Sequence, residues 1–401
     1  MNIFNFARKK EATPPIKESP RKLISSVVRQ AEYQTRKDIA DWQSAVNEAK
    51  GTYSKRQTRL QRIYENALTD ALLSSQMGLR IDKTQSTPFH VVGTDGKPNE
   101  DAERLLADNL LFDSLSEAII GSKMFGHSLV EFSFQDGKMS ASVLPRAHVY
   151  PAEGIFYPDL LSNQEVRYRE AAEYGKWYVE FGSRSADDLG LLNGVVPHVL
   201  MKRFAQSCWS ELCEVYGIPP MVIKTNTQDP EMVARIKEMF AGQGSNSKFL
   251  ADTTEEVEWA TGVATNGDVF RNLISLCNSE ISMSVCGAIL GQDTVNGNRS
   301  KEESSSRLLD SIVSADQRYV EANFNHAVLP ALAAIGYLPQ GLRLSFAKEV
   351  DLSNLWDMTA QALPYYEVNP QWIKDTFGID VTGTKQQQQA LAHNPQADFF
   401  A

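Results

Sequence analysis

Two long amphipathic segments that bracket a compact insert constrain the fold of this chain more than any other feature of its sequence. Apolar residues recur with helical period over residues 197–217 and again over residues 268–290. Gly217-Ile218-Pro219-Pro220 should end the first helix, and Gly291 the second. A helix of ~20 residues spans ~30 Å. Two such helices that return to one body therefore place the insert at their far end.

Each helix has a predicted buried face. In the first helix this face contains Met201, Phe204, Ala205, Cys208 and Leu212, whereas Lys202 and Arg203 lie outside it. In the second helix it contains Phe270, Leu273, Ile274, Cys277, Ile281, Val285 and Ile289. The four cysteines, Cys208, Cys213, Cys277 and Cys286, are interpreted as small buried hydrophobic residues.

The region before the first helix indicates an α+β domain. Residues 1–22 have no apolar period, so we expect a flexible arm, followed by peripheral helices from residue 23 to about residue 78. Asp136-Gly137 between alternating segments predicts a β-hairpin. A helix over residues 113–124 and a second strand pair over residues 166–181 complete this prediction.

The insert and the C-terminal part have clear boundaries. In the insert, residues 218–264, Asp229 should cap a helix between strands. A polar segment, residues 291–299, follows the second long helix. A third helix then begins at Ser300, with Glu303 at capping-box spacing, and residues 300–350 return to the first domain. Short helices should occupy residues 351–385, before a tail over residues 386–401.

The charge restricts the nucleic-acid roles that are open to the chain. Its net charge is −10 over 401 residues, which argues against a protein that wraps DNA tightly through Lys and Arg. A channel through which DNA slides is compatible with this charge, since weakly attractive walls favour movement. We find neither a secretory signal nor a membrane span and expect no membrane contact.

Motifs for catalysis are missing from the sequence. The glycines of residues 291–297 have the wrong spacing for a phosphate-binding loop and no following lysine. The cysteine and histidine spacings fit no known zinc site, and no G-x-S-x-G nucleophile motif is present. We therefore predict a protein that is not an enzyme and needs no metal or cofactor. A hydrolase site scattered through the α+β domain is the rival enzymatic hypothesis.

Two motifs resemble the portal proteins of tailed bacteriophages, in particular the Mu-like branch. The first is Trp209-Ser210-Glu211-Leu212-Cys213-Glu214-Val215-Tyr216-Gly217-Ile218-Pro219-Pro220. The second runs from Asn278-Ser279-Glu280-Ile281-Ser282 to Ala288-Ile289-Leu290-Gly291-Gln292, and it departs from the family pattern where Asp293 precedes Thr294.

This resemblance implies an α+β portal-like fold and a ring, usually a dodecamer. Residues 23–196 would form the wing, residues 197–217 and 265–290 the paired stem helices, and residues 218–264 the clip. Residues 291–299 would form the tunnel loop, and residues 351–385 a helical crown. The ring would sit at the capsid vertex of the virion after assembly in the host cytoplasm, and would conduct double-stranded DNA.

The implied partners are the large terminase, a major capsid or scaffold protein and a head–tail adaptor. The residues predicted to contact DNA in the tunnel loop are Gln292, Thr294, Asn296, Asn298, Arg299 and Lys301. For Arg299 and Lys301, a solvent-exposed position at a helix start is an open alternative. Lys202, Arg203 and Trp209 are assigned to the lumen or to a stem interface, and Lys224 and Lys248 to terminase or adaptor contact. The alternative function is a head–tail connector or minor capsid protein that does not conduct DNA.

Overall fold

The computed structural model describes residues 38–51, 57–162, 164–185, 187–217, 221–224, 230, 231, 233, 234, 256–259, 267–289, 299–347, 352–366 and 368–379. The chain divides into two compact units, Met1–Phe346 and Ala347–Ala401, which are described separately. No helix among these residues is both long enough and apolar enough to cross a membrane.

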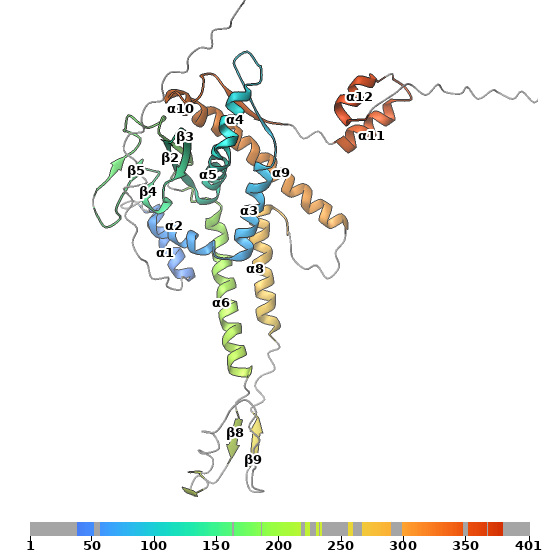
Figure 1. Ribbon diagram of the computed structural model, residues 1–401. Coiled ribbons are helices and arrows are strands. Elements are labelled where there is room, and N and C mark those ends of the chain that lie inside the picture. Colours follow the sequence, from blue (N-terminus) through green and yellow to red (C-terminus); the bar gives the residue numbers. More distant parts are fainter. Residues whose placement is uncertain are drawn as a thin grey trace, which may run out of the picture. The chain divides into compact units, whose positions relative to one another are not determined.

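Helices dominate the described part of the first unit (Figure 1). They are α1 (Ile39–Lys50), α2 (Thr58–Ala67), α3 (Ala71–Gln85), α4 (Glu100–Asp108), α5 (Leu111–Phe125), η2 (Arg146–His148), α6 (Leu192–Gly217), α8 (Asp268–Cys286), α9 (Arg299–Asn323), η3 (Phe324–Val328) and α10 (Leu329–Ala334). The π-helical turn η3 joins α9 to α10, so the chain remains helical up to and past Pro330.

The strands form small antiparallel sheets rather than one large one. They are β1 (Phe89–Val92), β2 (His127–Gln135), β3 (Lys138–Val143), β4 (Val149–Tyr150), β5 (Ile155–Phe156), β6 (Val166–Arg167), β7 (Tyr178–Gly182), β8 (Met221–Lys224), β9 (Glu256–Trp259) and β10 (Arg343–Phe346). Their pairings are β1–β10, β3–β2–β7, β4–β5–β6 and β8–β9.

The predicted hairpin is confirmed. Strands β2 and β3 pair antiparallel, and Gln135 lies opposite Lys138 across the turn. Asp136 has φ 51° and Gly137 has φ 77°, as a two-residue turn of this kind requires. The predicted strand pair over residues 166–181 is wrong, because β6 pairs with β5 and β7 pairs with β2. The turns between Arg167 and Tyr178 carry the chain from one sheet to the other.

The core of the first unit lies where α2, α3 and α5 pack with β2 and α9. Leu60, Ile63 and Tyr64 of α2 are at most 1% exposed, and the Tyr64 hydroxyl donates to the carbonyl of Leu189 at 2.9 Å. The prediction that the helices before residue 78 are peripheral is therefore wrong. The apolar faces of α1, α2 and α3 form part of the core.

The two long helices α6 and α8 lie side by side (Figure 1). Helix α6 begins at Leu192, before the predicted start at Pro197, because Val195, Val196 and Val199 extend its buried face. The predicted stripe of α8 is confirmed at its centre, where Cys277, Ile281 and Val285 are buried. Of the cysteines, Cys277 and Cys286 are buried as predicted, whereas Cys208 is half-buried and Cys213 exposed.

The predicted buried face of α6 is wrong at two positions. Phe204 is 56% exposed, whereas Lys202 is only 7% exposed. Helical period alone places the aromatic ring inside and the cation outside. A buried carboxylate, Asp70, reverses this expectation because it gives the lysine ammonium a partner within the body.

The second unit is a helix pair within its described residues, α11 (Leu352–Ala362) and α12 (Pro370–Phe377). Asn369 caps α12, with Pro370 at the first helical position and Gly378 in the left-handed conformation at the end. The rings of Trp356 and Trp372 both meet Phe377 edge-on. The Trp356–Phe377 contact joins the two short helices, whereas Trp372 and Phe377 both belong to α12.

Candidate functional site

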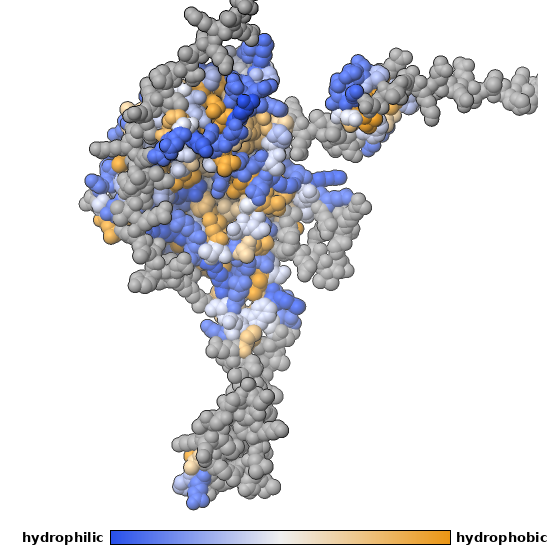
Figure 2. Space-filling model, in the orientation of Figure 1, coloured by the Kyte–Doolittle hydropathy of each residue, from blue (hydrophilic) through white to orange (hydrophobic). Residues whose placement is uncertain are grey.

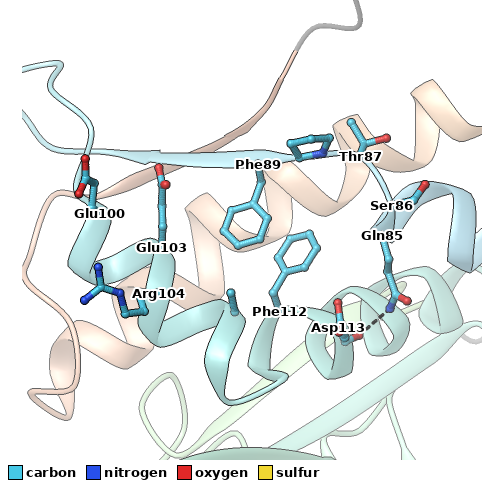
Figure 3. A pocket seen from close by; sticks show the side chains of 11 residues that line it. Gln85, Ser86, Thr87, Phe89, Glu100, Glu103, Arg104, Phe112 and Asp113 are labelled. Carbon is cyan, nitrogen blue, oxygen red and sulfur yellow. Dashed lines mark hydrogen bonds between the residues drawn. The ribbon is translucent and has the colours of Figure 1, made fainter.

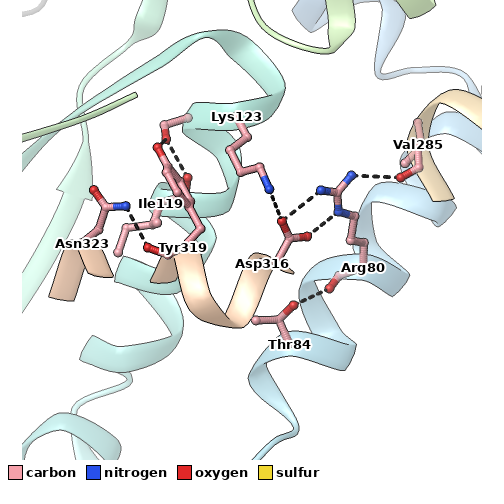
Figure 4. A network of polar contacts seen from close by, with 9 residues as sticks. Arg80, Thr84, Ile119, Lys123, Val285, Asp316, Tyr319 and Asn323 are labelled. Atoms are coloured by element: carbon pink, nitrogen blue, oxygen red, sulfur yellow. Dashed lines mark hydrogen bonds and ion pairs between the residues drawn. The ribbon is translucent and has the colours of Figure 1, made fainter. Parts of the chain in front are cut away.

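The C-terminal end of α8 is tied to α3 and α9 by a buried ionic network (Figure 4). Asp316 of α9 has no exposed surface, and its carboxylate accepts two hydrogen bonds from Arg80 of α3. Lys123 of α5 adds an ammonium 2.5 Å from the same carboxylate. Arg80 also donates to the carbonyl of Val285, in the last turn of α8, at 2.9 Å. A single guanidinium thus joins three helices.

A second contact, one helical turn earlier on α3, holds the residues that follow α8. The Gln76 amide donates to the Ser282 hydroxyl at 2.7 Å, and this hydroxyl donates to the carbonyl of Ala288 at 2.7 Å. Gly287 ends α8 in the left-handed conformation, with φ 68°. We call Gln76, Arg80, Ser282, Val285, Gly287, Ala288 and Asp316 the helix junction.

Helix α6 is attached to the body by two of the cations that the sequence singled out. The Lys202 ammonium lies 2.8 Å from the carboxylate of Asp70, which also caps α3. Arg203 donates to the side chain of Asn66 at 2.5 Å and to the Thr69 hydroxyl at 2.5 Å. Both side chains have partners within their own subunit, and their assignment to a lumen or an interface stays a prediction.

Trp209 lies at the far end of the helix pair. It is half-buried, and a Cβ on Gly267, the N-cap of α8, would lie 3.2 Å from its indole nitrogen. The ring therefore packs against the start of α8 within one chain. Whether it also takes part in an interface between subunits stays a prediction.

Three apolar side chains form an exposed line along α8. Val269, Leu276 and Met283 are 68%, 55% and 50% exposed and are spaced seven residues apart. Seven residues are nearly two helical turns, so all three point in almost the same direction. Figure 2 shows apolar surface interleaved with hydrophilic surface in the region of the helix pair. A stripe with this spacing is the pattern by which one helix packs against another.

The predicted DNA contacts lie largely outside the described residues. Gln292, Thr294, Asn296 and Asn298 fall in the segment between Ile289 and Arg299 that is not described. Arg299 and Lys301 belong to the first turn of α9, and their side chains are also outside the description. The helix junction holds the chain directly before this segment, at Ala288, and again within the helix that follows it, at Asp316.

The residues assigned to terminase or adaptor contact are not tested either. Lys224 ends β8, which pairs with β9 so that Lys224 lies opposite Glu256, but its side chain is outside the description. Lys248 lies outside the described residues.

A shallow pocket of about 480 Å³ lies between β1, α4 and α5 (Figure 3). Phe89 and Phe112 stack at its centre, with ring centroids 4.1 Å apart. Glu103 accepts a hydrogen bond from the backbone N–H of Val91 at 2.7 Å, so this carboxylate fixes β1 on α4. The pocket contains none of the predicted site residues. Among the described residues, no group of three or more Cys, His, Asp or Glu side chains could hold a metal ion.

Comparison with protein families identifies the chain. The family model described as the portal protein of Mu bacteriophage matches residues 61–379, which include α3, both long helices and the helix junction. The chain belongs to this portal family. The match confirms the resemblance inferred from the two sequence motifs. A search of curated proteins finds no match to the chain.

Solved structures show the same fold at low sequence identity. The neck of the native gene transfer agent (GTA) particle, computed with C12 symmetry, has a TM-score of 0.52 and 14% identity, covering 84% of this chain and 99% of that chain. The neck of the empty GTA particle, computed with C6 symmetry, has a TM-score of 0.52 and 13% identity, covering 79% and 92%. A chain from the virion of the native GTA particle has a TM-score of 0.52 and 14% identity, covering 85% and 99%.

Sequence reasoning missed the central residues of the helix junction. Arg80 and Asp316 are 236 positions apart, so no local spacing connects them. One signal was present, because Asp316 lies between Ile312 and Tyr319 on the apolar face of its helix. A charge on such a face predicts a buried partner, but not which residue provides it.

Proposed function

We propose that this portal-family chain is a subunit of a ring at the capsid vertex, through which double-stranded DNA enters and leaves. The observation that carries the proposal is the family match over residues 61–379, which covers the paired helices and their attachment to the body. The role is structural: the ring provides a passage, and a separate terminase supplies the driving force.

The exposed stripe on α8 supports assembly into a ring. Val269, Leu276 and Met283 would lose water contact if a neighbouring copy packed against them, which is worth ~25 cal/mol per Å² of apolar area buried. Contacts between unlike faces of identical subunits close into rings when the rotation between neighbours allows it. The C6 and C12 symmetries of the GTA necks support closure, and we propose a dodecamer.

The segment between α8 and α9 is the proposed DNA contact. Its polar residues Gln292, Thr294, Asn296 and Asn298, followed by Arg299 and Lys301, offer hydrogen bonds and positive charge to phosphates. A passage for a whole genome has to be independent of base sequence, and these side-chain types suit backbone contacts. Lys224 and Lys248 are the proposed contacts to the terminase or the head–tail adaptor. The capsid or scaffold protein would bind elsewhere on the ring, which would be assembled in the host cytoplasm.

Shortening this segment tests the proposal. We expect deletion of residues 293–296 to leave ring formation intact, because α8 and α9 remain held by the helix junction. DNA packaged per particle should fall, because the deletion removes two of the proposed backbone contacts, Thr294 and Asn296. Rings are counted by negative-stain microscopy, and packaged DNA is measured as nuclease-protected DNA. A matched control replaces residues 293–296 with four serines, which preserves the length and keeps hydrogen-bonding side chains at positions 294 and 296. Wild-type packaging by the shortened ring would refute the DNA-contact assignment.

A further inference from the structure

We infer that Asp316 is a positioning residue which, through Arg80, fixes the end of α8 against α9, the helix that begins at Arg299. It would thereby set the two ends of the segment proposed to contact DNA. The effect on DNA rests on the proposed function, whereas the contacts themselves involve described residues alone. Asp316 is fully buried on α9, and Arg80, on α3, binds both Asp316 and the Val285 carbonyl of α8.

The charge balance of the junction explains why these contacts depend on one another. Two cations, Arg80 and Lys123, face the single carboxylate of Asp316, so the carboxylate alone does not neutralise them. The last carbonyls of α8 offset part of the remaining positive charge, because the C-terminal end of a helix carries about −0.5 of an elementary charge. Arg80 donates to one of these carbonyls, that of Val285. Moving the end of α8 would therefore leave a buried cation short of a partner.

The packing around the junction leaves little freedom for an alternative arrangement. Gln76 and Arg80 are four residues apart on α3 and so face the same side. Gln76 reaches Ala288 through the Ser282 hydroxyl. From the other side, a Cβ on Gly287 would lie 2.7 Å from the Cδ1 of Ile312, so α9 packs directly on the turn that ends α8. Polar ties from α3 and apolar contact from α9 thus fix the same turn.

The chain provides a matched control on the same two helices. Lys83 of α3 pairs with Asp310 of α9 at 2.6 Å, but both side chains are exposed and neither contacts α8 in the described network. Asp310→Asn and Asp316→Asn each remove one ion pair between α3 and α9, and Asp316→Asn also removes the pair with Lys123 of α5. Only Asp316→Asn should release the end of α8.

The test measures the distance between α8 and α9 in assembled rings. Spin labels are placed at the exposed positions Ser284 and Arg307, in a chain whose accessible Cys208 and Cys213 are replaced by serine. Rings are diluted with unlabelled chain so that each contains at most one labelled subunit. We expect one narrow distance distribution in the parent chain and in Asp310→Asn. We expect a broadened distribution and a loss of packaged DNA in Asp316→Asn.

Two further variants separate positioning from simple loss of stability. Arg80→Lys keeps the buried charge but lacks the planar fork that binds both carboxylate oxygens and the Val285 carbonyl at once, so it should also broaden the distribution. Phe156→Ala creates a cavity in the β4–β5–β6 sheet and should lower thermal stability without changing the distribution.

An unchanged distribution in both junction variants would overturn the inference. A broadened distribution with normal packaging would overturn its link to DNA. If the ring that lacks residues 293–296 packages DNA normally, the DNA-contact assignment fails, while the distances still report on Asp316.

Discussion

Gly287→Ala is expected to destabilise the chain by about 1.5–3.5 kcal/mol, the sum of a backbone term and a side-chain term. Gly287 has φ 68°, a conformation that costs an alanine about 1–2 kcal/mol. The added methyl group would lie 2.7 Å from the Cδ1 of Ile312. This is the far end of a flexible side chain, so Ile312 can leave its preferred rotamer at a cost of about 0.5–1.5 kcal/mol. The two terms arise from different atoms and can be separated.

Ile312→Val removes the crowded carbon and serves as the second arm of a double-mutant cycle. The double variant should recover about 0.5–1.5 kcal/mol relative to the sum of the single variants, and the backbone term should remain. Gly78→Ala in α3 is the matched control. It places a methyl group where no atom lies within 4 Å in a regular helix, and it should stabilise by about 0.5–1 kcal/mol.

The assay is thermal unfolding followed by circular dichroism, at one fixed protein concentration because assembly contributes to the midpoint. The order of midpoints should be Gly78→Ala above the parent chain, and the parent above Gly287→Ala. If Gly287→Ala unfolds no earlier than the parent, both the backbone cost and the contact with Ile312 are refuted. If the effects of Gly287→Ala and Ile312→Val simply add, the loss of stability in Gly287→Ala comes from the backbone conformation alone.

Two further predictions concern assembly and acid stability. Leu276→Glu places a charge in the centre of the α8 stripe and should shift sedimentation from rings to smaller species. Ser275→Glu, at an exposed position on another side of α8, should assemble normally. Equal assembly of the two variants would show that the stripe is not part of the interface. Burial, with the positive charge of Arg146, lowers the pKa of His127 to about 4, against ~6.5 in the unfolded chain. Between these two pKa values the unfolded state binds a proton that the folded state does not. The contribution of His127 to the free energy of unfolding is therefore full above pH 6.5 and falls by up to about 3 kcal/mol as the pH drops to 4. His127→Leu should reduce the dependence of the unfolding midpoint on pH between pH 6.5 and 4. An unchanged dependence would show that His127 is not the cause of the acid sensitivity.

Local features of the fold could be predicted from the sequence because short-range physics determines them. Asp136-Gly137 specifies its hairpin through positive φ, and the stripe around Cys277 and Ile281 specifies the buried face of α8. The start of α6 was missed because Pro197 suggested a first helical turn. In the structure this proline is tolerated inside the helix, which begins at Leu192.

Features that depend on distant residues could not be predicted in this way. The burial of Lys202 depends on Asp70, and the helix junction joins Arg80 to Asp316. Sequence periodicity predicts that a lysine is exposed. A carboxylate that the fold places beside it can bury it, and the sequence does not show where that carboxylate lies. The two family motifs identified the helix pair, but not the network that attaches it to the body.

The β1–β10 pair has a consequence for synthesis on the ribosome. Phe89 of β1 pairs with Phe346 of β10, and Phe112 contacts both rings. At ~5–20 residues per second, ribosomes take on the order of ten seconds or more to make the chain between these strands. During that interval the edge of β1 and its aromatic neighbours lack their final cover. A nascent chain halted before residue 343 should therefore present an open strand edge, and chaperone binding to halted chains should drop once β10 has emerged.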